Sequence, residues 1–196
     1  FEKAYSYCRS NPDVKENYVG LMASYVNLAR CYMLQGMLDK THAYIEKLEA
    51  ECASYYEDID ILYVDCLKAR YYHLIHNYVR RDAQIQEIVE IINKNVQIME
   101  VFDDLCDFCG LMLEIGRDDV LWMIVEKLDQ IVKNSGVINL QRRVISIKIK
   151  GYRKNQDNAG YLQAAGLYYE LSEIMERENK DMIVNMLYVR SSLERA

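Results

Sequence analysis

Two short motifs in the sequence could ligate zinc. His73 and His76 form an H-x-x-H motif, and Cys106 and Cys109 form a C-x-x-C motif. Two imidazoles and two thiolates are a ligand set that zinc accepts in tetrahedral sites. Both motifs, however, fall inside predicted helices, where such spacings arise easily, and a buried cysteine also serves as a small apolar residue. We therefore expect packing roles here, with no metal and no cofactor.

Acidic clusters are the other groups that could perform chemistry. Carboxylates gather at 58–65 and at 103–107, and paired carboxylates can act as general acid and base. Clusters of this kind are more typical of solvated faces and helix starts. None of the three histidines has a serine and carboxylate at triad spacing, and no glycine-rich phosphate loop is present. We predict no catalytic residue and no enzyme activity; an enzyme built on a metal or a thiol at Cys106 or Cys109 remains the alternative.

Composition narrows the class of protein. The chain has 196 residues and a formal net charge of −6. It has no Lys/Arg-rich stripe, so nucleic acid is not an expected partner. No run of 18 or more apolar residues is present, so no membrane insertion is expected. The six cysteines lie mostly in helical stretches, which favours reduced thiols and a cytoplasmic location. One proline and eight glycines argue against a fold of short strands.

Apolar and aromatic residues recur every forty residues along the chain, and this repeat indicates which helices carry the residues named above. Three apolar or aromatic series follow this step: Tyr32, Tyr72, Met112 and Tyr152; Ile45, Ile85, Val125 and Ala165; Leu48, Ile88, Leu128 and Tyr168. A fixed period of this size is typical of stacked helical hairpins, because each hairpin buries the apolar face of its neighbour.

Periodicity and turn signals predict consecutive helices. They span 1–9, 17–34, 38–54, 58–76, 80–97, 99–114, 118–134, 137–153, 158–178 and 180–196. Pro12 marks the first turn, and Gly36 and Gly116 suit the left-handed conformation that ends a helix. Asp39, Asp118 or Asp119, and Asn158 are candidate N-caps. The β-branched stretch 144–150 has a strand-like pattern, but the forty-residue register places it in a helix.

Residues 25–48 resemble a tetratricopeptide repeat (TPR), and residues 105–128 match the same pattern. The matching residues are Tyr25, Leu28, Ala29, Tyr32, Gly36, Thr41, Ile45 and Leu48, and then Leu105, Phe108, Cys109, Met112, Gly116, Leu121, Val125 and Leu128. Asp65, Lys68 and Lys148 depart from the pattern, and the period exceeds the usual ~34 residues. The resemblance implies an all-α, TPR-like, right-handed superhelix of antiparallel hairpins over a single domain, 1–196. HEAT repeats are the architectural alternative.

A second resemblance concerns the C-terminal segment 182–196. It looks like the start of a signalling helix, and the whole array is similar to the N-terminal sensory regions of bacterial GGDEF-type diguanylate cyclases. This implies a regulatory module, with 180–196 as a connecting helix to a following domain and as a possible homodimer contact. The chain itself contains no GGDEF motif. The alternatives are the peptide-binding TPR region of a Gram-positive transcription regulator and a constitutive scaffold.

The TPR resemblance also implies a binding face, which is formed by the first helix of each hairpin. The residues expected there are Val26, Arg30, Met33, Cys66, Arg70, His73, Gly110 and Leu113. Arg30 and Arg70 on one face could hold a carboxylate of a bound peptide. The expected partner is therefore a protein or peptide.

Overall fold

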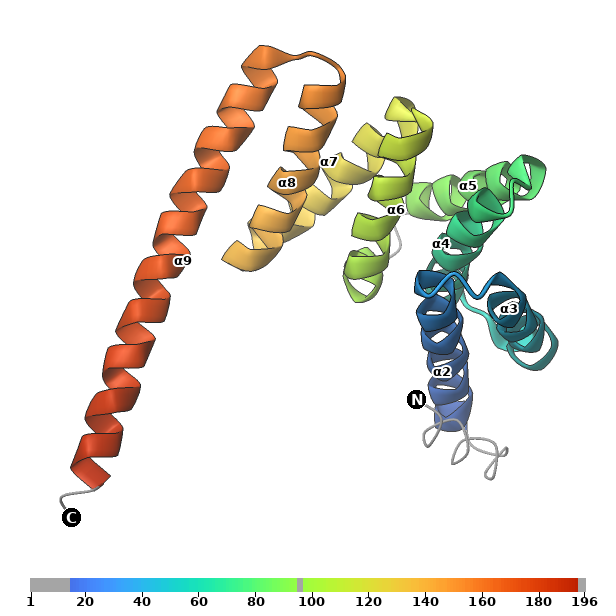
Figure 1. The fold of residues 1–196 in the computed structure, drawn as a ribbon, viewed down its shortest axis with the longest axis horizontal. Coiled ribbons are helices and arrows are strands. Elements are labelled where there is room, and N and C mark those ends of the chain that lie inside the picture. Colours follow the sequence, from blue (N-terminus) through green and yellow to red (C-terminus); the bar gives the residue numbers. More distant parts are fainter. Residues whose placement is uncertain (1–14, 95–96, 194–196) are drawn as a thin grey trace. The chain divides into compact units, whose positions relative to one another are not determined.

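The computed structural model describes residues 15–94 and 97–193 of the chain. All regular secondary structure in this part is helical: eight α-helices and two short 3₁₀ turns, with no strand (Figure 1). The all-α prediction is therefore confirmed. The predicted helix 1–9 and the turn at Pro12 lie outside the described residues.

The observed helices follow the predicted ones closely. They are α2 (Lys15–Leu34), α3 (Leu38–Cys52), α4 (Asp58–Leu74), α5 (Tyr78–Asn93), α6 (Phe102–Ile115), α7 (Asp118–Ser135), α8 (Ile138–Lys154) and α9 (Asn158–Leu193), with 3₁₀ turns η1 (Ala53–Tyr55) and η2 (Ile98–Val101). The stretch 144–150 is helical, as expected. The predicted break near residue 179 is wrong, because no glycine or proline interrupts residues 167–193 and α9 continues through them.

The chain forms two compact units, 1–108 and 109–196, and the division falls within α6. In the first unit, α2 packs on α3 and α4 packs on α5. In the second unit, α8 packs on α9 and on α7. Short connections join α2 to α3, α4 to α5 and α8 to α9, which favours antiparallel packing within these pairs.

Four of the connections share one backbone geometry. The N–H groups of Met37, Asn77, Arg117 and Asp157 each donate to the carbonyl five residues earlier, at 2.9–3.0 Å. The residue before each of these donors has a positive φ: Gly36 (73°), His76 (58°), Gly116 (77°) and Gln156 (57°). This is the left-handed C-terminal cap that satisfies the last carbonyls of a helix. The two glycines were predicted, whereas His76 and Gln156 adopt the same conformation with a Cβ and carry its steric strain.

The N-caps differ from those predicted. Asn77 accepts a hydrogen bond from the N–H of Arg80 at 3.2 Å, and Asp157 accepts one from the N–H of Gly160 at 2.9 Å. Asp39 and Asp118 instead lie in the first turn of α3 and α7. A carboxylate in that place is still favourable because it faces the positive end of the helix dipole.

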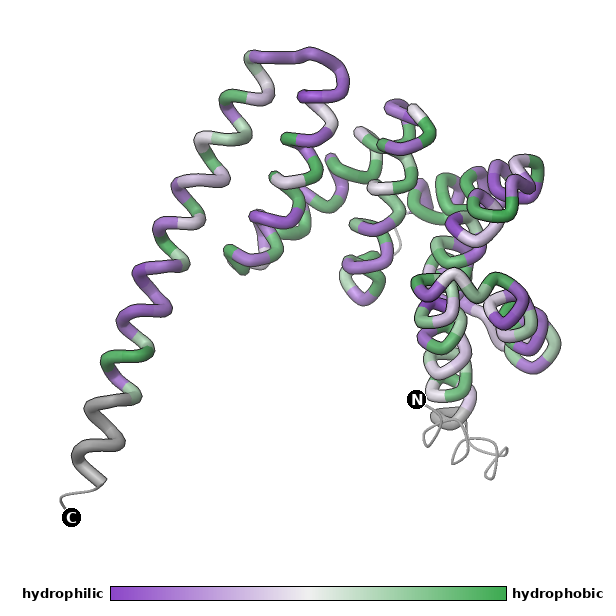
Figure 2. The backbone as a smooth tube through the Cα atoms, in the orientation of Figure 1, coloured by the Kyte–Doolittle hydropathy of each residue, from purple (hydrophilic) through white to green (hydrophobic). Residues whose placement is uncertain are grey.

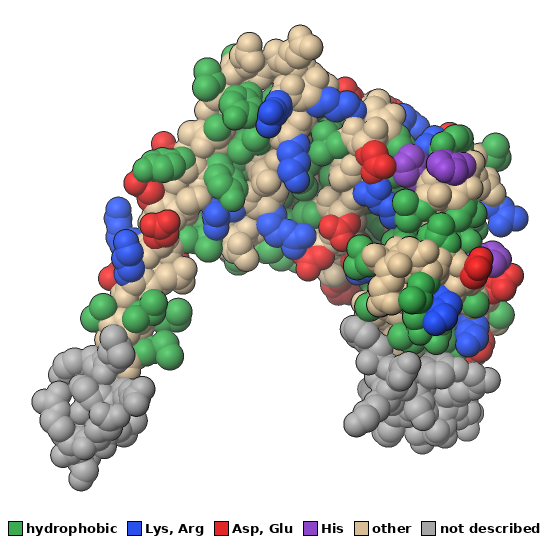
Figure 3. Space-filling model, in the orientation of Figure 1, with side chains coloured by type: hydrophobic (Ala, Val, Ile, Leu, Met, Phe, Trp, Pro, Cys, Tyr) green, Lys and Arg blue, Asp and Glu red, His purple; other side chains and the backbone are tan. Residues whose placement is uncertain are grey.

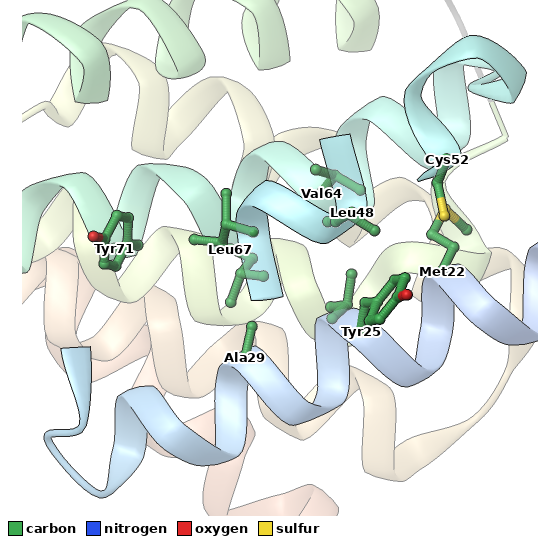
Figure 4. Close-up of a cluster of buried hydrophobic side chains, with 10 residues drawn as sticks. Met22, Tyr25, Ala29, Leu48, Cys52, Val64, Leu67 and Tyr71 are labelled. Atoms are coloured by element: carbon green, nitrogen blue, oxygen red, sulfur yellow. The ribbon is translucent and has the colours of Figure 1, made fainter. Parts of the chain in front are cut away.

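The core of the first unit lies between α2, α3 and α4. Figure 4 shows Met22, Tyr25 and Ala29 of α2 facing Leu48 and Cys52 of α3 and Val64, Leu67 and Tyr71 of α4. Tyr25 is fully buried, and its hydroxyl donates to Glu51 Oε2 at 2.7 Å, which removes the cost of burying a polar group. Of the tyrosines in the forty-residue series, Tyr32 and Tyr72 are only partly buried: Tyr72 packs against this cluster, and Tyr32 stacks on Tyr44 with ring centroids 5.5 Å apart.

In the second unit, a large side chain of one helix packs over a glycine of the next. The Trp122 ring of α7 lies 4.7 Å from the Tyr152 ring of α8, centroid to centroid. A Cβ added to Gly151 would come within 2.9 Å of the Trp122 ring. Eighty positions earlier, the second helix carries the smaller ring, His42, and the next helix carries a tyrosine in place of glycine; the rings of His42 and Tyr71 stack with centroids 5.8 Å apart. Along the chain, the connection from α8 to α9 is hydrophilic (Figure 2).

Candidate partner-binding face

An ion pair joins the first and third of the helices that were expected to form a binding face. Arg30 of α2 donates through Nη2 to Oδ1 of Asp104 in α6. The guanidinium also lies 5.8 Å from the centroid of the Tyr63 ring of α4. The side chain of Asp104 is 8% exposed and that of Arg30 is 30% exposed. Side chains of α2, α4 and α6 therefore meet in one polar cluster, which we call the Arg30 cluster.

Burial and charge compete within the Arg30 cluster. Desolvation raises the pKa of Asp104, and the nearby guanidinium of Arg30 only partly offsets that rise. Burial alone would lower the pKa of Arg30, but Asp104 outweighs it and the pKa is raised. Burial also raises the pKa of Tyr63, against the effect of Arg30. Arg30 is thus fully charged and already paired, so a peptide carboxylate would have to displace Asp104 to bind it.

The structure distributes the eight residues predicted for the binding face over core and surface. Val26 and Cys66 are buried in the core of the first unit, and Met33 packs against that core. Arg70 and His73 are partly buried, and His73 Nδ1 lies 3.3 Å from Arg81 Nη1.

The two remaining predicted residues belong to the second unit. Gly110 and Leu113 are partly buried in its portion of α6. The carbonyl of Leu113 accepts a hydrogen bond from Lys154 Nζ at 2.5 Å. The backbone of Leu113, and not only its side chain, therefore takes part in the packing of α6 against α8.

Asp65 and Lys68, which depart from the TPR pattern, form an ionic cluster with Glu49. Lys68 Nζ lies 3.0 Å from Asp65 Oδ1 and 2.9 Å from Glu49 Oε1 of α3. Asp65 is 1% exposed, and its Oδ2 has no hydrogen-bond partner within the described residues. Glu87 of α5 faces the same carboxyl group. Burial, reinforced by Glu87 and opposed by Lys68, raises the pKa of Asp65 to about 7.

The same type of bridge recurs eighty residues later. Lys148 of α8 binds Asp129 Oδ1 of α7 at 2.8 Å, at the positions that correspond to Lys68 and Glu49. Asp129 Oδ2 also binds Lys133 at 2.7 Å. Although Asp129 is largely shielded from water, these two lysines lower its pKa. These bridges were not predicted, although the common spacing of nineteen residues between acid and lysine is a signal for them in the sequence.

The two cysteines with motif spacing, and Cys52 of α3, have buried side chains. Cys106 and Cys109 are both buried within α6. No group of three or more His, Cys, Asp or Glu residues that could hold a metal ion occurs in the described part of the chain. Burial raises the pKa of the Cys52 thiol to about 12, which keeps it protonated and unreactive.

The sequence and structure of the chain were compared with those of known proteins. No family model, no curated protein and no solved structure matches this chain. Within residues 15–94 and 97–193, no helix has the length and apolar character needed to cross a membrane.

Proposed function

We propose that the chain is a TPR-like stack of helical hairpins, with a unit of about forty residues, that binds a protein or peptide through its first helices. The observation that carries this proposal is the recurrence of one turn geometry at Gly36, His76, Gly116 and Gln156. Hairpins of equal length that end in the same way can stack in register, and such stacks form extended binding surfaces.

The Arg30 cluster supports the location of the binding face. It links α2, α4 and α6, which are the first helices of successive hairpins, and it holds charged groups that are only partly exposed. Hydrogen bonds between charged groups in such places give geometric specificity to peptide recognition. Arg70, forty residues after Arg30, supplies a second guanidinium on α4.

A deletion tests the repeat architecture. Removing residues 37–76 joins Gly36 to Asn77 and so retains one complete turn, because these two residues hold the same turn positions in successive hairpins. The shortened chain should fold cooperatively, since Ile85 and Ile88 replace Ile45 and Leu48 as buried residues of the second helix. Removing 37–56 is the control and should unfold the first unit. If both deletions unfold the chain alike in circular dichroism and thermal melts, hairpins are not interchangeable units and the proposal fails.

A peptide selection tests the binding face. A phage-displayed library of random dodecapeptides is selected on the immobilised chain, and the enriched peptides are measured against Arg70→Ala and the exposed control Arg153→Ala. Enriched acidic peptides should bind Arg70→Ala at least several-fold more weakly and Arg153→Ala equally well. No enrichment, or equal affinity for both variants, would exclude this face.

We also propose that the chain is the regulatory region of a bacterial signalling protein such as a GGDEF-type diguanylate cyclase. The supporting feature is the C-terminal half of α9. Ala164 and Leu171 pack with Ile145 of α8, whereas Met182 and Met186, further along α9, are more than half exposed. Hydrophobic side chains along this helix are visible in Figure 3. This uncovered segment is suited to carry a change in the hairpins to a following domain, or to pair with a second copy.

Two measurements test the regulatory role. The reading frame beyond Ala196 should encode a catalytic signature, and a stop codon there would remove the cyclase proposal. Sedimentation velocity should show a concentration-dependent dimer that Met182→Glu abolishes while the matched exposed variant Leu162→Glu does not. A monomer at all concentrations would eliminate the pairing through α9.

A further inference from the structure

The turns α2–α3 and α4–α5 carry a set of exposed apolar side chains that neither packing nor turn geometry requires. The set comprises Leu34, Met37, Leu74, Ile75, Tyr78 and Val79. Leu34 is 81% exposed and Val79 is 83% exposed, which are the highest values among the exposed large hydrophobic residues of the described chain. We call this set, with Lys40 and Arg80, the turn edge.

The two turns lie at the same end of neighbouring hairpins. The ring of His42, in the second turn of α3, stacks on the ring of Tyr71, in the last turn of α4, with centroids 5.8 Å apart and an interplanar angle of 15°. His42 lies only four residues after the start of α3, and Tyr71 three residues before the end of α4. At 1.5 Å per residue, each ring is about one helical turn from its connection, so the exposed residues of the two turns form one surface.

Two cations on the turn edge are held in equivalent positions. Lys40 Nζ lies 5.1 Å from the centroid of the Tyr32 ring, and the Arg80 guanidinium lies 5.6 Å from that of Tyr72. Both side chains are exposed, and neither forms an ion pair with a carboxylate of the described residues. A cation over a tyrosine face is restrained without being neutralised. These two charges are therefore ordered and available to an external anion.

The α4–α5 turn is further ordered by contacts of Tyr78. The Arg81 guanidinium lies 4.7 Å from the centroid of the Tyr78 ring, and His76 Nδ1 lies 3.0 Å from the Tyr78 hydroxyl. Arg81 also bonds Asp82 through Nε at 2.8 Å. These contacts restrain the exposed aromatic and charged groups before any partner arrives, which reduces the entropy lost on binding.

The second unit uses the same turn geometry without these features. Glu114 and Lys154 occupy the positions of Leu34 and Leu74, and Val120 and Gly160 occupy those of Lys40 and Arg80. The positive-φ turns at Gly116 and Gln156 form nonetheless. Exposed leucine and a tyrosine-stacked cation are thus not structural requirements of this turn, and their presence in both turns of the first unit calls for another explanation.

We infer that the turn edge of the first unit binds a protein segment in which large apolar side chains alternate with carboxylates. The apolar side chains of that segment would cover Leu34, Leu74 and Val79, and its carboxylates would pair with Lys40 and Arg80. An anionic membrane surface is disfavoured, because Asp39 and Asp82 lie exposed on the same edge and the chain carries a formal net charge of −6. This surface is separate from the Arg30 cluster, and its existence does not depend on the proposed function.

Designed peptides test the inference on the full chain. The probe is a fluorescent 18-residue peptide with leucine along one helical face and glutamate at the positions that flank this face, so that both can contact the turn edge, and its binding is followed by fluorescence anisotropy. Matched peptides carry lysine for glutamate, or alanine for leucine. The leucine–glutamate peptide should bind at least ten-fold more tightly than either, and its affinity should fall with added salt. Equal binding of the lysine peptide, or no binding at millimolar concentration, would overturn the inference.

Variants of exposed residues locate the site. The double variants Lys40→Glu/Arg80→Glu and Leu34→Ser/Val79→Ser should each weaken binding at least ten-fold. The control Arg153→Glu/Leu162→Ser changes residues of the second unit that are also exposed and should leave binding unchanged. Circular dichroism verifies that each variant is folded. An equal loss in the control, or retained binding in both edge variants, would refute the location. Binding to phosphatidylserine vesicles in preference to the peptide would favour a membrane and also refute the inference.

Discussion

Replacement of Asp65 by leucine should stabilise the first unit. Asp65 occupies a core position, since the residues at the corresponding places of the other hairpins, Tyr25, Leu105 and Ile145, are all buried and none is charged. Its carboxyl group is 1% exposed, and Oδ2 lacks a hydrogen-bond donor within the described residues. Asp65→Leu restores the apolar series, and Lys68 keeps Glu49 as its partner at 2.9 Å.

The magnitude follows from the cost of burying the charge. A carboxyl group with a pKa of about 7 in the folded chain, against an ordinary value of 3.8, loses on the order of 4 kcal/mol of folding free energy when it is fully ionised. Replacement of buried ionic groups by apolar residues commonly gains about 1–4 kcal/mol. We therefore expect Asp65→Leu to raise the free energy of unfolding at pH 8 by about 2 kcal/mol.

The sign of the pH dependence provides a second test. Because the folded pKa is raised, the wild-type penalty is absent below the unfolded pKa near 4, grows as pH rises, and is complete above about 7. The stability of the wild-type chain should therefore fall between pH 5 and pH 8 relative to that of Asp65→Leu. Asparagine has the shape of aspartate but cannot ionise. The stability of Asp65→Asn should therefore vary with pH as little as that of Asp65→Leu over this range.

Urea unfolding followed by circular dichroism at pH 5 and pH 8 measures these differences. Native-state hydrogen exchange of peptides from α4 assigns them to the first unit, and Trp122 fluorescence reports the second unit as an internal control. The exposed Glu100 provides a control for the loss of one negative charge, through Glu100→Leu. The prediction is wrong if Asp65→Leu destabilises the chain by more than about 1 kcal/mol at pH 8. It is also wrong if the difference in free energy of unfolding between variant and wild type does not grow with pH, because the buried carboxylate would then not destabilise the fold.

Three further predictions concern the second unit. Gly151→Ala should lower the melting temperature, by a net loss of about 1 kcal/mol, because the new Cβ would meet the Trp122 ring at 2.9 Å and this outweighs the helix propensity of alanine; in the Trp122→Leu background the same change should stabilise, and destabilisation in both backgrounds would refute the contact. Gln156→Gly should raise the free energy of unfolding in urea by about 1 kcal/mol, since glycine adopts a φ of 57° without strain, and no gain would argue against that conformation. Lys148→Ala should raise the pKa of Asp129 in an NMR titration. The variant should therefore lose less stability than the wild-type chain as the pH falls below about 4. An unchanged pKa would show that Lys133 alone lowers the pKa of Asp129.

The helices could be predicted because their signals are local and repeated. Gly36 and Gly116 marked two helix ends in the sequence, whereas His76 and Gln156, which lie forty residues after each, form the same turn without a glycine. The break predicted near residue 179 was wrong, because no glycine or proline stands there to end the helix. Helix ends are thus predictable where a residue with special backbone freedom, or an exact repeat of one, is present.

The chemistry of the candidate face could not be predicted to the same degree. Arg30 was singled out by its helical position, but its partner, Asp104, lies 74 residues away in the sequence and no spacing rule connects the two. Val26 and Cys66 are buried because neighbouring helices cover them, which depends on packing angles and not on the pattern of one helix. The Lys68 and Lys148 bridges were detectable, since both join an acid and a lysine nineteen residues apart.

These bridges make the contacts between successive hairpins chemically unlike one another. Glu49 and Asp129 meet a lysine on the next helix, while the corresponding pair on α5 and α6 is Val89 and Phe108. If α3 or α7 packed instead against a helix with phenylalanine at this position, or α4 or α8 against one with valine, the ion pair would be lost, at a cost of about 1 kcal/mol for these partly exposed groups. Charge complementarity of this kind favours the observed neighbours, α3 with α4 and α7 with α8, over exchanged pairings of the same helices.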